Sequence, residues 1–172
     1  MRTLSQYGYH HIGTSGDCGV YQDVLSSLIE EEAYTISAWV YVVSGSGSVF
    51  LETYDGVDFA RIQANTIGTG WQRITASDDI GADLTSACVW VGGSGEFYFD
   101  NMQLETGGIS DFTYSATNLL VNPGFESAFA SWSDWNDATR TWSYLGTDLG
   151  LQMRTFMEVT TPSSTVYRWA VG

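Results

Sequence analysis

The chain has 172 residues and a formal net charge of −14, with 20 carboxylates against six arginines and no lysine. Glycine, serine and threonine make up about a third of it, and β-branched and aromatic residues are frequent, which excludes a disordered polymer and a helical bundle. We expect no nucleic-acid partner, because contacting phosphates needs a basic face that so few arginines cannot build. We expect no membrane insertion either, since no apolar run is long enough to cross a bilayer.

Up to residue 105, short alternating segments are separated by clusters of Gly, Ser and Asp at intervals of about ten residues. This spacing is typical of an antiparallel β-sandwich or barrel. The clusters include SGSG at 44–47 and GGSG at 92–95, which favour turns. The expected strands are 7–12, 19–24, 34–43, 48–54, 59–63, 71–76, 87–91 and 96–104.

The segment 34–43 has two distinct faces, because successive side chains of a strand point to opposite sides. One face is aliphatic and consists of Ile36, Ala38, Val40 and Val42. The other face consists of Thr35, Ser37, Trp39 and Tyr41. Aromatic rings beside small hydroxyl residues are typical of a sugar-binding surface, but a central strand buried on both faces has the same pattern. Both interpretations stay open.

After residue 105 the composition changes. Residues 106–117 are expected to be a linker, and a stretch rich in Trp, Tyr and Thr follows it. The expected strands in this part are 118–120, 141–145, 151–157 and 165–171. No segment has the pattern of a helix longer than a turn or two, so we expect an all-β chain.

Residues 19–45 followed by 70–107 resemble the galactose-binding-like jelly-roll modules. Such modules occur as carbohydrate-binding modules of secreted glycoside hydrolases and in phage tail, fibre and decoration proteins. The run NLLVNPGFES at 118–127, with Trp132 after it, resembles the N-terminal strand and first loop of the same family. The resemblance implies an antiparallel jelly-roll β-sandwich and specifies a ligand only weakly.

The order of the two pieces differs from the family, in which the NLLVNPGFE-like strand comes first. We therefore divide the chain into a jelly-roll core at 1–117 and a segment at 118–172 that completes a sandwich. Three arrangements stay open: a circularly permuted chain that closes its own sandwich, a chain that completes its neighbour's, or a slice through two tandem modules. Strand exchange would satisfy an otherwise open sheet edge and would build an assembly of subunits.

The resemblance also implies a structural calcium ion. In related modules this ion lies between the loop of the first strand and the Asp of the last strand. By motif match its ligands would be Asp100 and Glu126, with backbone carbonyls completing the oxygen shell. The alternative is that Asp100 caps a local turn and Glu126 is solvated.

Catalytic motifs are mostly absent from the sequence, and a pair of carboxylates for glycoside hydrolysis stays the alternative, since Asp and Glu are abundant. There is no GxSxG elbow, HExxH pair or P-loop, and His10 and His11 would point to opposite sides of one strand. We therefore expect a protein that is not an enzyme, with structural or surface histidines. Cys18 and Cys88 have no CxxC spacing; we expect two buried free thiols, and a single disulfide is the alternative.

Sugar recognition needs aromatic faces for stacking and planar polar groups for hydroxyls. The aromatic candidates are Trp39, Tyr41 and Trp90. Their candidate polar partners are Gln22, Tyr54 and Arg61. For each aromatic residue the alternative is a place in the core or in a subunit interface. We expect the later tryptophans to be packing anchors for assembly, namely Trp132, Trp135, Trp142 and Trp169.

Two functions fit this sequence. The first is a non-catalytic structural or adhesive component of a virion or other surface, which self-associates or contacts neighbouring subunits and binds glycan weakly. The second is a glycan-binding module of a secreted polysaccharide-degrading enzyme or cell-surface protein. The first 25 residues lack the apolar core of a signal peptide, so the expected location is a virion or an extracellular surface reached without a visible signal.

Overall fold

The computed structural model describes residues 7–13, 19–107, 118–123, 125, 127, 130–135, 139–144, 157–161 and 164–168. In these residues the secondary structure is almost entirely β, with one short 3-10 helix, η1, at Leu25–Ser27. The strands are β1 Tyr7–Gly13, β2 Gly19–Asp23, β3 Ala33–Tyr54, β4 Phe59–Asn65, β5 Gly70–Asp79, β6 Ser86–Thr106, β7 Ser133–Trp135, β8 Thr139–Tyr144, β9 Met157–Thr161 and β10 Ser164–Arg168. Every strand pair is antiparallel, and β9 and β10 form a separate two-stranded sheet. The expected all-β antiparallel fold is confirmed.

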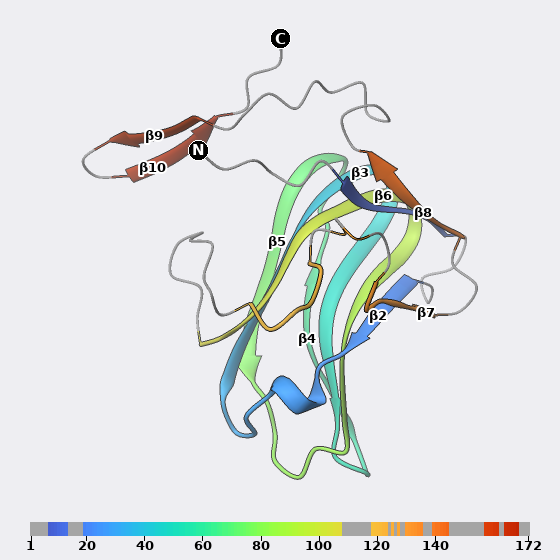
Figure 1. Ribbon diagram of the computed structural model, residues 1–172, viewed down its shortest axis with the longest axis vertical. Helices are drawn as coiled ribbons and strands as arrows, with labels where there is room; N and C mark the ends of the chain where they lie inside the picture. Colours follow the sequence, from blue (N-terminus) through green and yellow to red (C-terminus); the bar gives the residue numbers. More distant parts are fainter. Residues whose placement is uncertain are drawn as a thin grey trace.

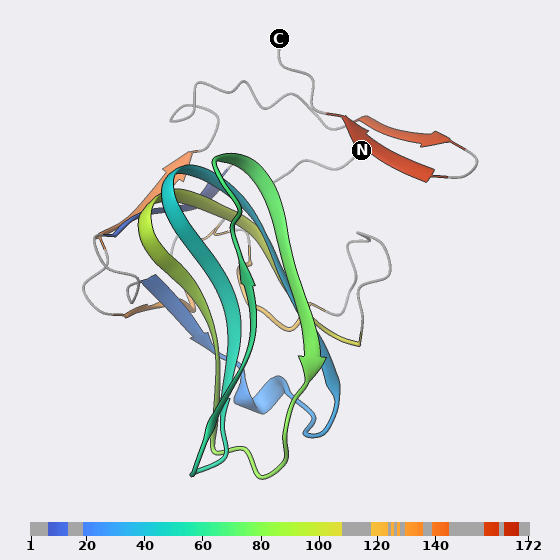
Figure 2. The same ribbon diagram turned by 180° about the vertical axis from the view of Figure 1, so that it is seen from behind.

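Two long strands organise the sandwich. β3 and β6 pair with each other along almost their whole length, and both bend sharply, so that each rises and then descends in Figures 1 and 2. On one side of the bend the strand order is β5-β3-β6-β1-β8, which we call the first layer. On the other side it is β4-β3-β6-β2-β7, the second layer. Both layers therefore share two continuous strands.

The SGSG and GGSG runs lie at this bend, and their prediction as turns between separate strands was wrong. Neither run forms a hairpin turn, because the β3–β6 register continues through the pairs Gly45↔Gly95 and Gly47↔Gly93. Gly45 has a φ of +80°, and a Cβ on it would lie 1.9 Å from the carbonyl oxygen of Ser94. Glycine is required because two backbones approach closely where both strands bend.

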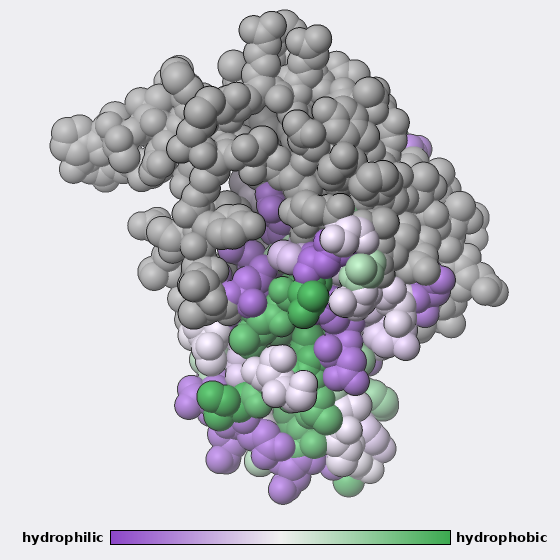
Figure 3. All heavy atoms as spheres, in the orientation of Figure 1, coloured by the Kyte–Doolittle hydropathy of each residue, from purple (hydrophilic) through white to green (hydrophobic). Residues whose placement is uncertain are grey.

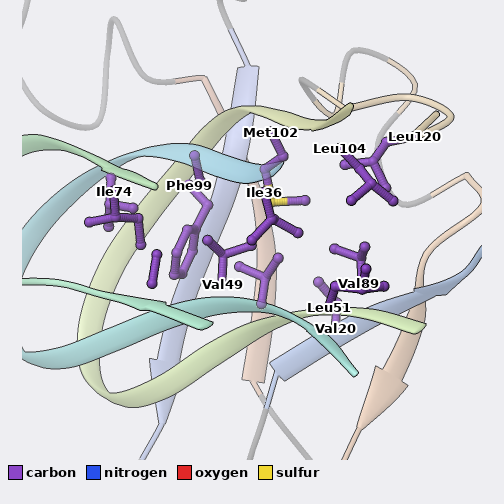
Figure 4. Close-up of a cluster of buried hydrophobic side chains, with 14 of the residues drawn as sticks. Val20, Ile36, Val49, Leu51, Ile74, Val89, Phe99, Met102, Leu104 and Leu120 are labelled. Carbon is purple, nitrogen blue, oxygen red and sulfur yellow. The ribbon is translucent and has the colours of Figure 1, made fainter. Parts of the chain in front are cut away.

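The core lies between the two layers. Alternate side chains of β3 and β6 point inward and meet, as Figure 4 shows for Ile36, Leu51, Val89 and Phe99. The predicted aliphatic face of 34–43 is confirmed, since its four residues are all buried in this cluster. Burying each Val, Leu or Ile side chain contributes roughly 1.5–3 kcal/mol. Alternation therefore fixes which side chains of both layers face outward.

The described residues among 118–132, which we call the strap, are 118–123, 125, 127 and 130–132, and they lie at the side of the sandwich seen in Figure 1. The predicted strand at 118–120 was wrong. The Asn118 side chain makes hydrogen bonds to the backbone of β6 where a strand would make backbone pairs. Its Nδ2 donates to the Met102 carbonyl at 2.9 Å, and its Oδ1 accepts from the Leu104 amide at 3.0 Å. The Leu119 amide also donates to the Leu104 carbonyl, at 2.9 Å. The strap is thus fixed to the end of β6.

The strap also fills the core of this chain. Leu120, Phe125 and Trp132 are buried in the same cluster as the strand residues. Figure 3 shows hydrophobic residues gathered over the 118–121 part and η1, where Leu25 and Leu119 cover the core. Trp132, expected to anchor an assembly, instead packs on Phe125, with ring centroids 5.2 Å apart.

Several expectations concern residues that the structure describes only in part. The backbones of Trp135 and Trp142 lie in β7 and β8, but their side chains are not described, and Trp169 lies outside the described residues. β8 and β10 overlap the expected strands 141–145 and 165–171, whereas β7 and η1 were not expected. Residues 108–117 and 151–156 lie outside the described part, so the division of the chain at residue 117 stays a prediction.

Candidate functional site

The structure separates the residues predicted to bind a ligand into three places. On the outer side of the first layer lie Trp39 and Tyr41, which alternate with buried Ala38 and Val40. On the outer side of the second layer lie Trp90, Tyr54 and Arg61. Gln22 lies under the strap and is buried. No single ligand site contains all six.

The outer side of the first layer carries inclined aromatic rings. The rings of Tyr41 and Trp71 are 5.4 Å apart at an angle of 56°, and those of Tyr41 and Tyr98 are 6.4 Å apart at 57°. Rings at such angles do not cover each other's faces as parallel stacked rings do. Trp39, Tyr41 and Trp71 are each half-buried, so none of them is fully removed from solvent. This arrangement can stack against the apolar face of a sugar.

An arginine lies directly beside these rings. Arg73 on β5 pairs in register with Trp39, and its Nη2 donates to the Ser37 hydroxyl and to Gln103 Oε1, both at 3.0 Å. These two bonds hold the guanidinium against the sheet, so little side-chain entropy is lost when it donates to a ligand. We call Trp39, Tyr41, Trp71, Arg73, Tyr98 and Gln103 together the first-layer face.

Only Trp39 and Tyr41 of the first-layer face were predicted from the sequence. Trp71 and Arg73 have the outward parity of β5. Tyr98 and Gln103 are five residues apart on β6 and share the outer side because the bulge at Asn101 shifts the alternation. The sequence signal for Trp71 and Arg73 was their spacing of two residues, which is the same as the spacing of Trp39 and Tyr41 on β3. These residues lie together because of the register between strands, which pairs residues that are far apart in the sequence.

The expected calcium ligands are only half described. Asp100 is buried, and its Oδ1 accepts from the Asn101 amide at 2.7 Å, within a bulge where Asn101 has a φ of +46°. Glu126 lies outside the described residues. Among those described, no group of three His, Cys, Asp or Glu residues is placed to hold a metal ion. One buried carboxylate does not supply the six to eight oxygens that calcium takes, so calcium stays a prediction.

The two motifs that this calcium site requires do meet in the chain. The Met102 amide, next to the bulge, donates to the Pro123 carbonyl of the strap at 3.1 Å. A melting temperature that is unchanged between excess calcium and chelator would contradict the predicted ion, because a ligand bound only to the folded state must raise it.

The centre of the second layer's outer side is a packed row of rings. Trp90 lies between Phe50, stacked at 6.1 Å and 19°, and Tyr21, at 4.7 Å and 34°. The Arg61 guanidinium lies 4.7 Å above the Phe50 ring. Neighbouring groups therefore lie on both sides of the Trp90 ring, which makes it less suitable for stacking on a sugar than Trp39.

Gln22 has a structural role in this arrangement. Its Nε2 donates to the carbonyls of Val121 and Ser131, at 2.9 and 3.2 Å, and its Oε1 accepts from the Val121 amide at 2.8 Å. Both ends of the amide thus hold the strap, because a buried amide is stabilised only when its polar atoms are satisfied. Gln22 does not lie on either outer side.

His11 is also inside the sandwich. Its ring is fully buried and stacks on Phe97 at 4.7 Å and 7°. Nδ1 lies 2.7 Å from the Tyr9 hydroxyl and Nε2 lies 3.0 Å from the Gly93 carbonyl, so the ring ties β1 to the bend of β6. This is the structural role expected for it, whereas the His10 side chain is not described.

Cys88 is a free thiol and Cys18 lies outside the described residues. Burial, with the Asp23 and Glu52 carboxylates nearby, raises the pKa of the Cys88 thiol from 9.0 to about 11. Because the thiolate is the reactive form, we expect alkylation at pH 8 to be about a hundredfold slower than for an ordinary thiol. In a Cys18→Ser variant, iodoacetamide labelling should accelerate up to pH 11 and on unfolding. Rapid labelling of the folded protein at pH 8 would contradict this.

No family model matches the sequence, and comparison with curated proteins finds no match. Among solved structures, the chain is similar to the CBM22-1 xylan-binding domain from Paenibacillus barcinonensis Xyn10C, with a TM-score of 0.47 and 16% identity over 60% of this chain and 74% of that one. It is also similar to the CBM22-1-GH10 modules of the Clostridium thermocellum endo-1,4-beta-D-xylanase 10B in complex with xylohexaose. That match has a TM-score of 0.47 and 18% identity, over 59% of this chain but only 22% of that one. No residue role follows from either likeness.

In the part of the chain that the structure describes, no helix has both the length and the apolar character that crossing a membrane requires.

Proposed function

We propose that the chain is a non-catalytic, carbohydrate-binding-module-like β-sandwich that binds a glycan on its first-layer face. The observation that supports this most is the combination of Trp39, Tyr41 and Trp71, inclined and half-buried, with Arg73 held in place by Ser37 and Gln103. Sugar rings have apolar faces that stack on such aromatic residues and hydroxyls that accept from a guanidinium.

The charge of the chain favours an uncharged glycan. A net charge of −14 repels anionic polysaccharides at a distance. On the face itself Arg73 is accompanied by the carboxylate of Glu105 on the neighbouring β6. A uronic acid or sulfate placed there would meet at least as much negative charge as positive charge.

Binding is tested by calorimetry with soluble xylan, mixed-linkage β-glucan, galactomannan and, as the anionic control, polygalacturonate. We expect one neutral polymer to bind and Trp39→Ala to weaken it roughly 30-fold, since a central aromatic contact contributes about 2 kcal/mol or more. Arg73→Ala should weaken binding, and Arg73→Lys should restore part of it, because it keeps the charge but loses the planar fork.

Ile67→Ala is the matched control, because Ile67 is almost fully exposed on the loop between β4 and β5. Its affinity should equal that of the wild type. Failure of every polymer to bind, or unchanged affinity in both Trp39→Ala and Arg73→Ala at unchanged unfolding midpoint, would contradict the proposal.

A second candidate function is assembly at a virion or cell surface. It is favoured by the strap, which docks through the side chains of Asn118 and Gln22 and would fit the same place in a neighbouring copy. The test is the native mass over a roughly hundredfold dilution, since association between copies follows mass action. A persistent multimer supports assembly, whereas a monomer throughout contradicts it.

A further inference from the structure

A second exposed aromatic surface lies on the outer side of the second layer, at the hairpin that joins β3 to β4. Phe59 is 66% exposed, although it is a large apolar side chain. Its ring stacks on that of Tyr54, the residue opposite it in register, at 4.4 Å and 24°. One face of Phe59 is thus covered by Tyr54, and the exposed area belongs to the other face and the edge.

A planar polar group lies next along the same strand. Arg61 follows Phe59 by two residues, so both side chains are on the same side of β4, about 7 Å apart along the strand. The Arg61 Nε donates to Glu52 Oε2 at 2.6 Å, and the guanidinium lies over Phe50. Its side chain is still 50% exposed. The ion pair fixes Arg61 while leaving half of it accessible to solvent.

Stabilisation of the hairpin accounts for only part of this arrangement. A stacked cross-strand pair contributes roughly 0.2–1 kcal/mol to a sheet, which accounts for the contact between Tyr54 and Phe59. It does not account for a phenyl face turned to water beside an oriented guanidinium. An apolar ring face with adjacent planar donors and acceptors matches the amphipathic surface of a sugar.

The charges around the hairpin favour an uncharged ligand. Asp55 accepts from the amides of Val57 and Asp58, at 2.7 and 2.8 Å, and these bonds hold the pKa of its carboxyl below the usual value. Asp55 is therefore ionised at neutral pH. Because Arg61 is already paired with Glu52, the surroundings of Phe59 are net negative and repel anionic groups.

We propose that Tyr54, Phe59, Arg61 and Glu52, which we call the hairpin face, form a second glycan-binding site for an uncharged sugar. It lies on the opposite outer side of the sandwich from the first-layer face. The inference rests on the proposed function for the class of ligand, but its residues are separate. With two faces, one chain holds two glycan strands and cross-links them.

The test uses the full-length chain and the neutral polymer that binds best, at lengths of many sugar residues. We expect the wild type to cross-link the polymer, which turbidity and light scattering measure, and to bind oligosaccharides at two sites per chain. Phe59→Ala should abolish cross-linking and halve the number of sites while lowering the free energy of unfolding by no more than about 1 kcal/mol, since Phe59 is exposed and loses only its stacking on Tyr54. Phe59→Tyr should retain both, and Val57→Ala, at the exposed tip of the same hairpin, is the matched control.

The variants of the two faces separate the two proposals. If Trp39→Ala removes all binding and Phe59→Ala changes nothing, the hairpin face is not a site and the proposed function stands. If Phe59→Ala removes all binding and Trp39→Ala changes nothing, the first-layer face is not a site and the hairpin face stands. If Phe59→Ala instead turns a dimer into a monomer with unchanged binding per chain, the hairpin face is an interface between copies and the inference is overturned.

Discussion

Gly45→Ala is expected to destabilise the whole sandwich by about 3 kcal/mol or more. The new Cβ would lie 1.9 Å from the Ser94 carbonyl oxygen, which belongs to backbone and cannot rotate away. Gly45 also has a φ of +80°, a conformation that alanine adopts only with strain. Relief of the clash requires β3 and β6 to separate at the bend that both layers share. Guanidinium unfolding, followed by tryptophan fluorescence, measures the effect.

Gly81→Ala is the matched control for this substitution. No atom lies within 4 Å of a Cβ built at Gly81, so the space around it is open. Its unfolding midpoint should stay within about 0.5 kcal/mol of the wild type, as for surface substitutions in general. Equal midpoints for Gly45→Ala and Gly81→Ala would show that the two strands do not approach closely at the bend.

Phe125→Ala is expected to cost about 3–5 kcal/mol, the range for removing a buried aromatic ring. Phe125 is fully buried and contacts Tyr9 and Trp132, with ring centroids 5.7 and 5.2 Å apart. It therefore links the strap to β1 in one core. The loss should appear as a lower midpoint of a single cooperative transition with an unchanged denaturant slope.

Val121→Ala is the control for Phe125→Ala, because it truncates an exposed side chain of the strap instead of a buried one. Val121 belongs to the same segment but is 60% exposed, so truncating it should change stability little. If Phe125→Ala were as mild as Val121→Ala, or gave a separate early transition, the strap would not be part of the common core.

Alternation along one strand was enough to predict its core face. Ile36, Ala38, Val40 and Val42 are buried as predicted, because a period of two leaves only two ways to orient a strand whose one face is aliphatic. The turns predicted from residue type at 44–47 and 92–95 were wrong. Glycine clusters serve both tight turns and close backbone crossings, and only the partner strand decides between them.

The candidate site could be predicted only in part, because it depends on register. Trp39 and Tyr41 were identified from their own strand, but Trp71 and Arg73 join them through a pairing that spans more than 30 residues of sequence. Gln22 was chosen as a polar ligand contact, and nothing local shows that the strap, about 100 residues later, occupies its amide. The sequence therefore identified side chains with suitable chemistry, but it did not show which of them lie together.

The two outer faces are joined by unbroken backbone, because β3 and β6 pass through both layers. Two partners bound to opposite faces would pull on the sandwich from both sides. This tension would pass along the continuous backbones of β3 and β6 and the hydrogen bonds between them, with no loop in between that could stretch. Such a ladder yields by shearing many hydrogen bonds together rather than by unzipping them one at a time. As a mechanical element, the sandwich would be stiff between its faces, and the glycine bend would be the point at which strain concentrates.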